Sequence, residues 1–213
     1  KMLSTVDVLS GGRLVVGVGV GWLEEEFEAL DAKPFRERGK VTDECLRIFK
    51  ALWTEETPSF SGDYYSFEPL QFAPKPIQKP GPPIWVGGQS RAAIRRVVRY
   101  GDAWHPVGAN PASPLEPDTL VTEIEYMGTF CEKVGRNMSE ITVAMKAPVY
   151  DREVTTEGGR RRFSGEPDQI IEDVNTYAEV GVSHLILDTR SSDLNKFFEK
   201  MDWLAEEGIS KAR

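Results

Sequence analysis

Short, continuous apolar runs alternate with longer segments of helical periodicity along most of the chain. Runs that do not alternate between apolar and polar residues are typical of strands buried on both faces. Five runs fit this description, at residues 14–18, 84–86, 103–105, 141–149 and 184–187. Because helical segments separate them, we expect a parallel β-sheet covered by helices.

The helical segments carry apolar stripes with clear ends. These stripes span residues 41–53, 93–98, 120–134, 170–178 and 194–204. Gly101, Gly135 and Gly181 follow three of them, and glycine commonly terminates a helix. A repeated strand-helix order fits either a doubly wound sheet or a (β/α)8 barrel. In both folds, ligands bind at the carboxyl ends of the strands.

This rule assigns each loop to one of two edges. The loops expected on the functional rim are residues 17–22, 87–90, 105–110, 150–165 and 188–192. Loops on the opposite edge are expected to serve stability, and they are residues 10–13, 101–102 and 181–183.

Two segments interrupt the strand-helix order. Residues 57–83 contain 7 of the 14 prolines and several aromatic residues, which predicts an ordered insertion with a hairpin around residues 61–63. Residues 151–166 contain two adjacent glycines and three consecutive arginines, Arg160 to Arg162. We expect this second segment to be a mobile loop on the rim.

Composition and charge narrow the class of protein. The 213 residues include 10 Phe, 6 Tyr and 5 Trp, far more apolar surface than a disordered chain carries. Apolar stretches reach only about six residues, against the ~20 of a membrane-spanning helix. The net charge of −8 disfavours a nucleic-acid partner. Cys45 and Cys131 fall on apolar helix faces, as free thiols in a reducing compartment do, so we expect a cytoplasmic protein.

A glycine-rich turn follows the first predicted strand. Gly17, Gly19 and Gly21 alternate with valines there, and glycine lets a ligand approach the backbone N–H groups closely. A dinucleotide fingerprint needs a compact unit of ~30 residues, whereas the next strand here begins more than sixty residues later. Two interpretations stay open, a cradle for an anionic ligand and a tight turn that requires small residues.

A second glycine turn, residues 87–90, follows the next predicted strand and precedes a helix. Ser90 is expected to cap that helix, and Arg91 lies at its amino end. Backbone donors, a helix dipole and a guanidinium together make a candidate phosphate site. Arg95 and Arg99, one and two turns further along, are expected on the solvated face of the helix.

The chain contains two histidines. His105 ends its strand on the rim, where it is a candidate proton donor or substrate ligand, although a lone histidine is often structural. His184 begins its strand at the opposite edge and is expected to be structural. No metal site is expected, because the histidines, cysteines and carboxylates do not show ligand spacing.

Four motifs occur in order along the chain, at residues 7–13, 22–27, 82–88 and 101–106. Together they resemble the luciferase-like monooxygenase superfamily. Residues 165–169 and 181–188 are most similar to the branch of that superfamily that uses the deazaflavin coenzyme F420. The resemblance extends over nearly the whole chain.

The resemblance implies a (β/α)8 TIM barrel of the bacterial luciferase-like type, which binds a flavin or deazaflavin at its rim. Residues 1–213 then form a single domain comprising the C-terminal five βα units, with strands one to three of the barrel missing from this chain. The implied activity is hydride transfer between F420 and a small organic substrate, by an oxidoreductase expected to be a homodimer. The alternatives are an FMN-dependent monooxygenase and a catalytically silent flavin-binding protein.

The resemblance also implies which residues bind the coenzyme. At the matching positions these are Gly19, Val20, Gly21, Glu25, Gly87, Gly88 and Gln89. Trp22 stands where some relatives place an acidic residue, so its ring is expected to pack against the coenzyme instead. Arg91 and residues 160–162 are expected to favour the acidic tail of F420, although a disordered basic loop explains residues 160–162 equally well. His105 is the candidate catalytic residue.

Overall fold

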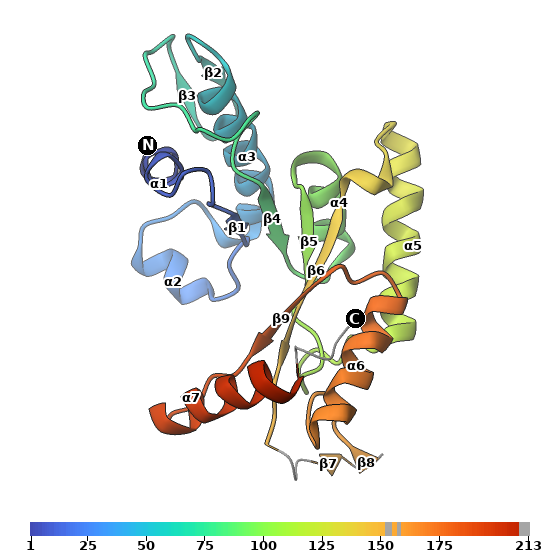
Figure 1. Cartoon of the computed structure of the whole chain (residues 1–213). Helices are drawn as coiled ribbons and strands as arrows, with labels where there is room; N and C mark the ends of the chain where they lie inside the picture. Colours follow the sequence, from blue (N-terminus) through green and yellow to red (C-terminus); the bar gives the residue numbers. More distant parts are fainter. Residues whose placement is uncertain (152–154, 157–158, 209–213) are drawn as a thin grey trace. The chain divides into compact units, whose positions relative to one another are not determined.

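The computed structural model describes residues 1–151, 155–156 and 159–208 (Figure 1). The chain divides into two compact units, the first made of residues 1–87 and 92–103 and the second of residues 88–91 and 104–213. The boundary between the units therefore passes through one strand and the start of one helix. The prediction of a single domain concerns how the two units combine, and it stays a prediction.

All five predicted strands are present. They are β1 (Val16–Val18), β4 (Ile84–Gly87), β5 (Ala103–His105), β6 (Thr142–Pro148) and β9 (His184–Asp188). β1 begins two residues later than its apolar run, and the carbonyl of Leu14 instead accepts a hydrogen bond from Gln78 Nε2 at 2.8 Å. β1 pairs with β4 and β6 pairs with β9, both in parallel, which confirms the predicted α/β class.

The helices of the first unit lie on either side of the insertion in sequence. They are α1 (Met2–Leu9), α2 (Glu24–Ala29), α3 (Arg38–Thr54) and α4 (Arg91–Tyr100), with a 3₁₀ turn at Phe35–Glu37. α3 and α4 confirm two predicted stripes. α1 and α2 were not predicted, because both are short and every side chain of α2 is exposed or half-buried. The first turn of α2 holds three glutamates, whose charge suits a helix N-terminus.

The hairpin predicted within residues 57–83 is confirmed. It consists of the antiparallel strands β2 (Phe60–Ser61) and β3 (Ser66–Phe67). The rings of Phe60 and Phe67 stack across the pair, with centroids 6.2 Å apart. This cross-strand contact stabilises a hairpin that is too short to be stable by itself.

Glu44 of α3 holds the turn of this hairpin. Its side chain is 1% exposed, and its carboxylate accepts hydrogen bonds from the backbone N–H groups of Asp63 at 2.9 Å, Tyr64 at 3.0 Å and Tyr65 at 2.7 Å. Burial alone would raise the pKa of Glu44. The three amide hydrogen bonds and the charge of Arg47 outweigh burial, so the pKa lies below its usual value.

A second buried carboxylate fixes the insertion near its C-terminal end. Asp7 of α1 accepts hydrogen bonds from the backbone N–H groups of Ile77 at 2.8 Å and Gln78 at 3.0 Å, and from Gln78 Nε2 at 2.7 Å. These bonds outweigh the effect of burial and lower the pKa of Asp7. The insertion is therefore attached at its hairpin turn by Glu44 of α3 and near its C-terminal end by Asp7 of α1.

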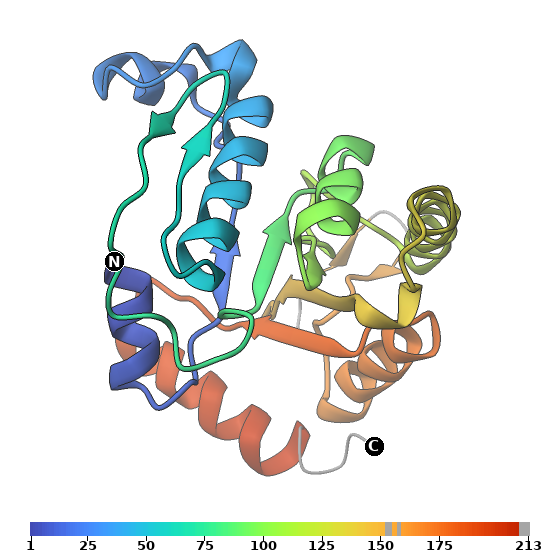
Figure 2. The same ribbon diagram turned by 90° about the horizontal axis from the view of Figure 1, so that it is seen from above.

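The second unit is built around β6 and β9. Its remaining elements are α5 (Pro117–Val134), a 3₁₀ turn at Met138–Glu140, β7 (Thr155–Thr156), β8 (Gly159–Arg160), α6 (Pro167–Glu179), α7 (Leu194–Trp203) and a π-helical turn at Leu204–Gly208. Figures 1 and 2 show α5 and α6 on the same side of β6. Gly135 ends α5 with a φ of 71°, which confirms that predicted stop.

The segment predicted as a mobile loop, residues 151–166, is described in part, because residues 152–154 and 157–158 lie outside the described residues. The end of the segment is fixed on α6. Phe163 is fully buried and stacks on Tyr177, with ring centroids 5.5 Å apart. The mobility of the segment stays a prediction.

Both cysteines are unbonded thiols. Cys45 is half-buried in α3 and Cys131 is buried in α5, as the helical periodicity predicts. Burial raises the pKa of both thiols, so neither is activated as a thiolate. Across the described ranges, no helix combines the length and the apolar character needed to cross a bilayer.

Candidate functional site

The turn after β1 lies at the carboxyl edge of the strand pair in the first unit. Val18, the last residue of β1, is opposite Val86 of β4. Gly19 therefore leaves its strand beside Gly87, the last residue of β4. The structure thus brings two predicted coenzyme-binding segments to the same edge.

The space around each glycine distinguishes the two interpretations of this turn. A Cβ on Gly17 or Gly19 would meet no described atom within 4 Å, so no described atom crowds the side-chain direction of either residue. Gly21 has a φ of +83°, and a Cβ on it would lie 2.6 Å from the ring of Phe27. Gly21 is therefore explained by a tight turn that requires a small residue. This explanation does not apply to Gly19, for which the cradle interpretation stays open.

Trp22 follows the turn and is 82% exposed. Val20 is half-buried, and Glu25 is exposed in the first turn of α2. An exposed indole leaves a large, flat apolar surface in water, which is available to pack against a planar ring system. Coenzyme contacts for these three residues stay predictions.

The turn after β4 belongs to the second unit from Gly88 onwards. Gly88 has a φ of +107°, and its carbonyl accepts a hydrogen bond from Trp104 Nε1 at 2.8 Å. The side-chain amide of Gln89 donates to the carbonyl of Val107. Two side-chain hydrogen bonds therefore fix this turn to β5 and to the loop that follows β5.

Arg91 is the first residue of α4, as expected, but its guanidinium is directed at α5. Its Nε lies 3.7 Å from Glu123 Oε2, and the guanidinium lies over the ring of Tyr126, 4.5 Å from the centroid. The side chain is 57% exposed, so this ion pair is weak. A role for Arg91 toward an anionic coenzyme stays a prediction.

His105 ends β5, and its ring orientation is fixed by the neighbouring strand. Its Nδ1 lies 2.5 Å from the carbonyl oxygen of Ala144 on β6. A carbonyl can only accept a hydrogen bond, so Nδ1 carries the proton. In the neutral ring Nε2 is then the basic nitrogen.

A charged group on β6 and β9 was not predicted. Lys146 Nζ lies 2.9 Å from Asp188 Oδ2, and Arg190 donates to both oxygens of Asp188. Burial raises the pKa of Asp188, but the hydrogen bonds from Arg190 and Lys146 outweigh it and lower the pKa to about 2. A lysine inside an otherwise apolar run was the one signal in the sequence that could have indicated this pair.

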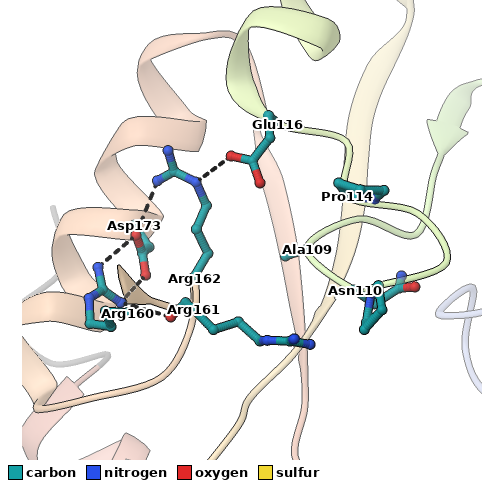
Figure 3. A pocket seen from close by; sticks show the side chains of 9 residues that line it. Ala109, Asn110, Pro114, Glu116, Arg160, Arg161, Arg162 and Asp173 are labelled. Carbon is teal, nitrogen blue, oxygen red and sulfur yellow. Dashed lines mark hydrogen bonds and ion pairs between the residues drawn. The ribbon is translucent and has the colours of Figure 1, made fainter. Parts of the chain in front are cut away.

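A cavity of about 450 Å³ opens in the second unit between the loop after β5 and the segment after β6 (Figure 3). Its lining residues are Ala109, Asn110, Pro111, Pro114, Glu116, Arg160, Arg161, Arg162 and Asp173. Both segments were expected on the rim. The two carboxylates were not predicted as part of a site, because acidic residues in or beside a helical pattern usually face solvent.

Known proteins resemble this chain in sequence. The family profile described as luciferase-like monooxygenase matches residues 1–157. An FMNH2-dependent dimethylsulfone monooxygenase of Pseudomonas putida is 40% identical over 119 residues, which are 54% of this chain and 32% of the relative. An uncharacterized protein of Mycobacterium tuberculosis is 34% identical over 127 residues, 60% of this chain and 42% of the relative. The chain thus spans less than half the length of these curated relatives.

Solved structures resemble the fold. An F420-dependent secondary alcohol dehydrogenase superposes with a TM-score of 0.79 at 18% identity, covering 99% of this chain and 73% of the other. Monooxygenase RslO1 from Streptomyces bottropensis gives a TM-score of 0.78 at 21% identity, covering 96% and 70%. The likeness confirms the predicted luciferase-like barrel class, while relatives with either FMNH2 or F420 occur. With a profile match over most of its length, the chain belongs to the luciferase-like monooxygenase family.

Proposed function

We propose that the protein is an oxidoreductase that binds reduced FMN at the carboxyl edge of its strands and monooxygenates a small organic substrate. The observation that carries this proposal is the glycine turn after β1, where the space beside Gly19 is free of described atoms and Trp22 presents an exposed ring. The 40% identity to an FMNH2-dependent monooxygenase supports FMN as the coenzyme.

The residues of the first unit fit a coenzyme with a phosphate-bearing arm. A phosphate binds well to backbone N–H groups that no side chain covers. The space around a Cβ position on Gly19 is empty of described atoms, and Gly87 leaves the neighbouring strand beside it. Val20 and Trp22 add apolar surface next to these donors, as a planar ring system requires.

In the second unit, His105 is the candidate for proton transfer. When bound, reduced FMN supplies the electrons that activate molecular oxygen. Because Nδ1 of His105 donates to the Ala144 carbonyl, Nε2 is the atom that can hold or release a proton. The β6 carbonyl also prevents the ring from turning, so the position of Nε2 is fixed.

Hydride transfer with F420 is the second candidate function. The resemblance of residues 165–169 and 181–188 to the F420-using branch favours it. Both candidates use the same glycine turn, but they differ in their need for oxygen. Monooxygenation consumes O2, whereas hydride transfer between F420 and a substrate proceeds without it.

Coenzyme binding and oxygen uptake distinguish the two candidates. The purified protein is titrated with FMN and with F420, and O2 uptake is then measured with chemically reduced FMN and dimethylsulfone. Binding of FMN with sulfone-dependent O2 uptake supports the proposal. Tight binding of F420 with anaerobic hydride transfer replaces it with the second candidate. Binding of neither coenzyme refutes both candidates.

A matched pair of variants tests the location of the phosphate. Gly19→Asp places a carboxylate over the open backbone, and we expect it to weaken coenzyme binding about tenfold or more through like-charge repulsion. Gly128→Asp is the control, because a Cβ at Gly128 of α5 also meets no described atom within 4 Å. Equal affinities of the two variants would place the phosphate elsewhere.

A further inference from the structure

The cavity in the second unit contains an arginine whose charge is not used within its walls. Three consecutive arginines and two carboxylates line it, which leaves one positive charge. The contacts of each arginine show where that charge lies. Figure 3 shows Arg160 and Arg162 turned toward Asp173, whereas Arg161 extends toward Asn110.

Arg160 and Arg162 are neutralised by the carboxylates. Arg160 Nη1 lies 2.7 Å from Asp173 Oδ2, and Arg162 Nη1 lies 3.2 Å from Asp173 Oδ1. Arg162 Nε lies 2.8 Å from Glu116 Oε2. Asp173 is buried and also accepts the backbone N–H of Phe163 at 2.7 Å. These bonds build a fixed wall and use both negative charges of the cavity.

Arg161 has no such partner. Within residues 1–151, 155–156 and 159–208, no carboxylate forms an ion pair with its guanidinium. Its Nε is buried without a hydrogen-bond partner in that part of the chain. A buried N–H without an acceptor is destabilising, and native proteins rarely leave one unsatisfied. The described residues therefore supply neither an acceptor for Nε nor a carboxylate for the Arg161 guanidinium.

The position of Arg161 is fixed at both ends. Its carbonyl accepts hydrogen bonds from the backbone N–H of Ser164 at 3.2 Å and from Ser164 Oγ at 2.6 Å. Its guanidinium lies over the ring of Tyr150, 4.8 Å from the centroid, and Tyr150 Oη donates to the Ala109 carbonyl at 3.1 Å. A guanidinium that stacks on an aromatic ring can still donate its N–H groups in its own plane.

We propose that this cavity binds an oxyanion group, a carboxylate, sulfonate or phosphate, with Arg161 as the residue that contacts it. A guanidinium fork matches two oxygens of such a group. The volume of about 450 Å³ also has room for the organic part of the molecule. The assignment of the oxyanion to the substrate or to the coenzyme rests on the proposed function. The existence of the anion site does not depend on that function.

Simple anions test the site without any coenzyme. Methanesulfonate, acetate and inorganic phosphate are titrated at constant ionic strength while the arginine Nε–H resonances are followed by NMR. We expect a saturable shift of the Arg161 resonance and binding at least tenfold weaker in Arg161→Met. Arg161→Lys keeps the charge and loses the fork, so its affinity should lie between the two.

The matched control is Arg36→Met, which makes the same change in net charge at an arginine that is 85% exposed. It should bind all three anions like the wild type. Equal binding by Arg161→Met, with an unchanged melting temperature, would overturn the proposal. A resonance shift that does not saturate, or one that Arg36→Met also removes, would overturn it as well.

Coenzyme titrations identify the source of the anion. If Arg161→Met weakens the binding of FMN or F420 at least tenfold, the anion belongs to the coenzyme. If coenzyme affinity is unchanged and methanesulfonate still binds beside saturating coenzyme, the anion belongs to the substrate. If the protein binds neither coenzyme but anion binding still depends on Arg161, the proposed function fails and the anion site stands.

Discussion

Replacing Glu44 by glutamine should loosen the insertion without a change in shape. The amide oxygen can keep the bonds to Tyr64 and Tyr65, which share one carboxylate oxygen, while the NH2 group then faces the backbone N–H of Asp63. One charge-assisted bond is lost, at about 1.5–3 kcal/mol, and the other two become neutral and weaker. We expect a loss of about 3 kcal/mol, which lowers the melting temperature by roughly 6–12 °C for a chain of this size.

Thermal unfolding and amide hydrogen exchange check this prediction. Glu68→Gln is the control, because Glu68 lies exposed in the same insertion. Exchange should accelerate at residues 63–65 in the Glu44 variant alone. Because folding lowers the pKa of Glu44, its stabilisation is complete above the unfolded pKa and is lost as the pH falls through the folded pKa. Equal melting temperatures of the two variants, or a difference between wild type and Glu44→Gln that grows in acid, would refute the reasoning.

Three further predictions concern the rim and its supports. Trp22→Ala should weaken coenzyme binding several-fold but change the free energy of unfolding by less than about 0.5 kcal/mol, since the ring is exposed; calorimetry measures both. Gly21→Ala should cost about 1–3 kcal/mol because of its positive φ and the Phe27 ring, whereas Gly19→Ala should be nearly neutral in chemical denaturation. Asp173→Asn leaves two guanidiniums undercompensated and should increase proteolysis within residues 151–166, while Asp168→Asn on the exposed part of α6 should not.

The strands and most helices could be predicted from the sequence because their signal is local. A continuous apolar run such as residues 84–86 has one low-energy environment, a sheet covered on both sides. α2 was not predicted because it has no apolar stripe. The feature that favours a helix there is the set of acidic side chains in its first turn. Local patterns therefore predict elements that bury a face and miss those that do not.

The sequence predicts which loops follow the strands, but not the contacts that their residues make. Loop order placed Gly19 and residues 160–162 on the rim. Whether the space beside Gly19 is empty depends on which atoms the folded chain brings near it, and no local pattern specifies that. Glu44 and Asp173 are buried, although charged residues on helices usually face water. Their partners include backbone amides far away in the sequence or in a different segment, which no residue pattern specifies.

The attachment of the hairpin through Glu44 also determines which positions can diverge. Glu44 binds three backbone amides and no side chain of residues 63–65, so any residue except proline can occupy these positions and keep the same anchor. Gly62 has no such freedom, because a Cβ there would collide with the Glu44 carboxylate. Selection or engineering can therefore rewrite the tip of this insertion residue by residue while its backbone stays in register.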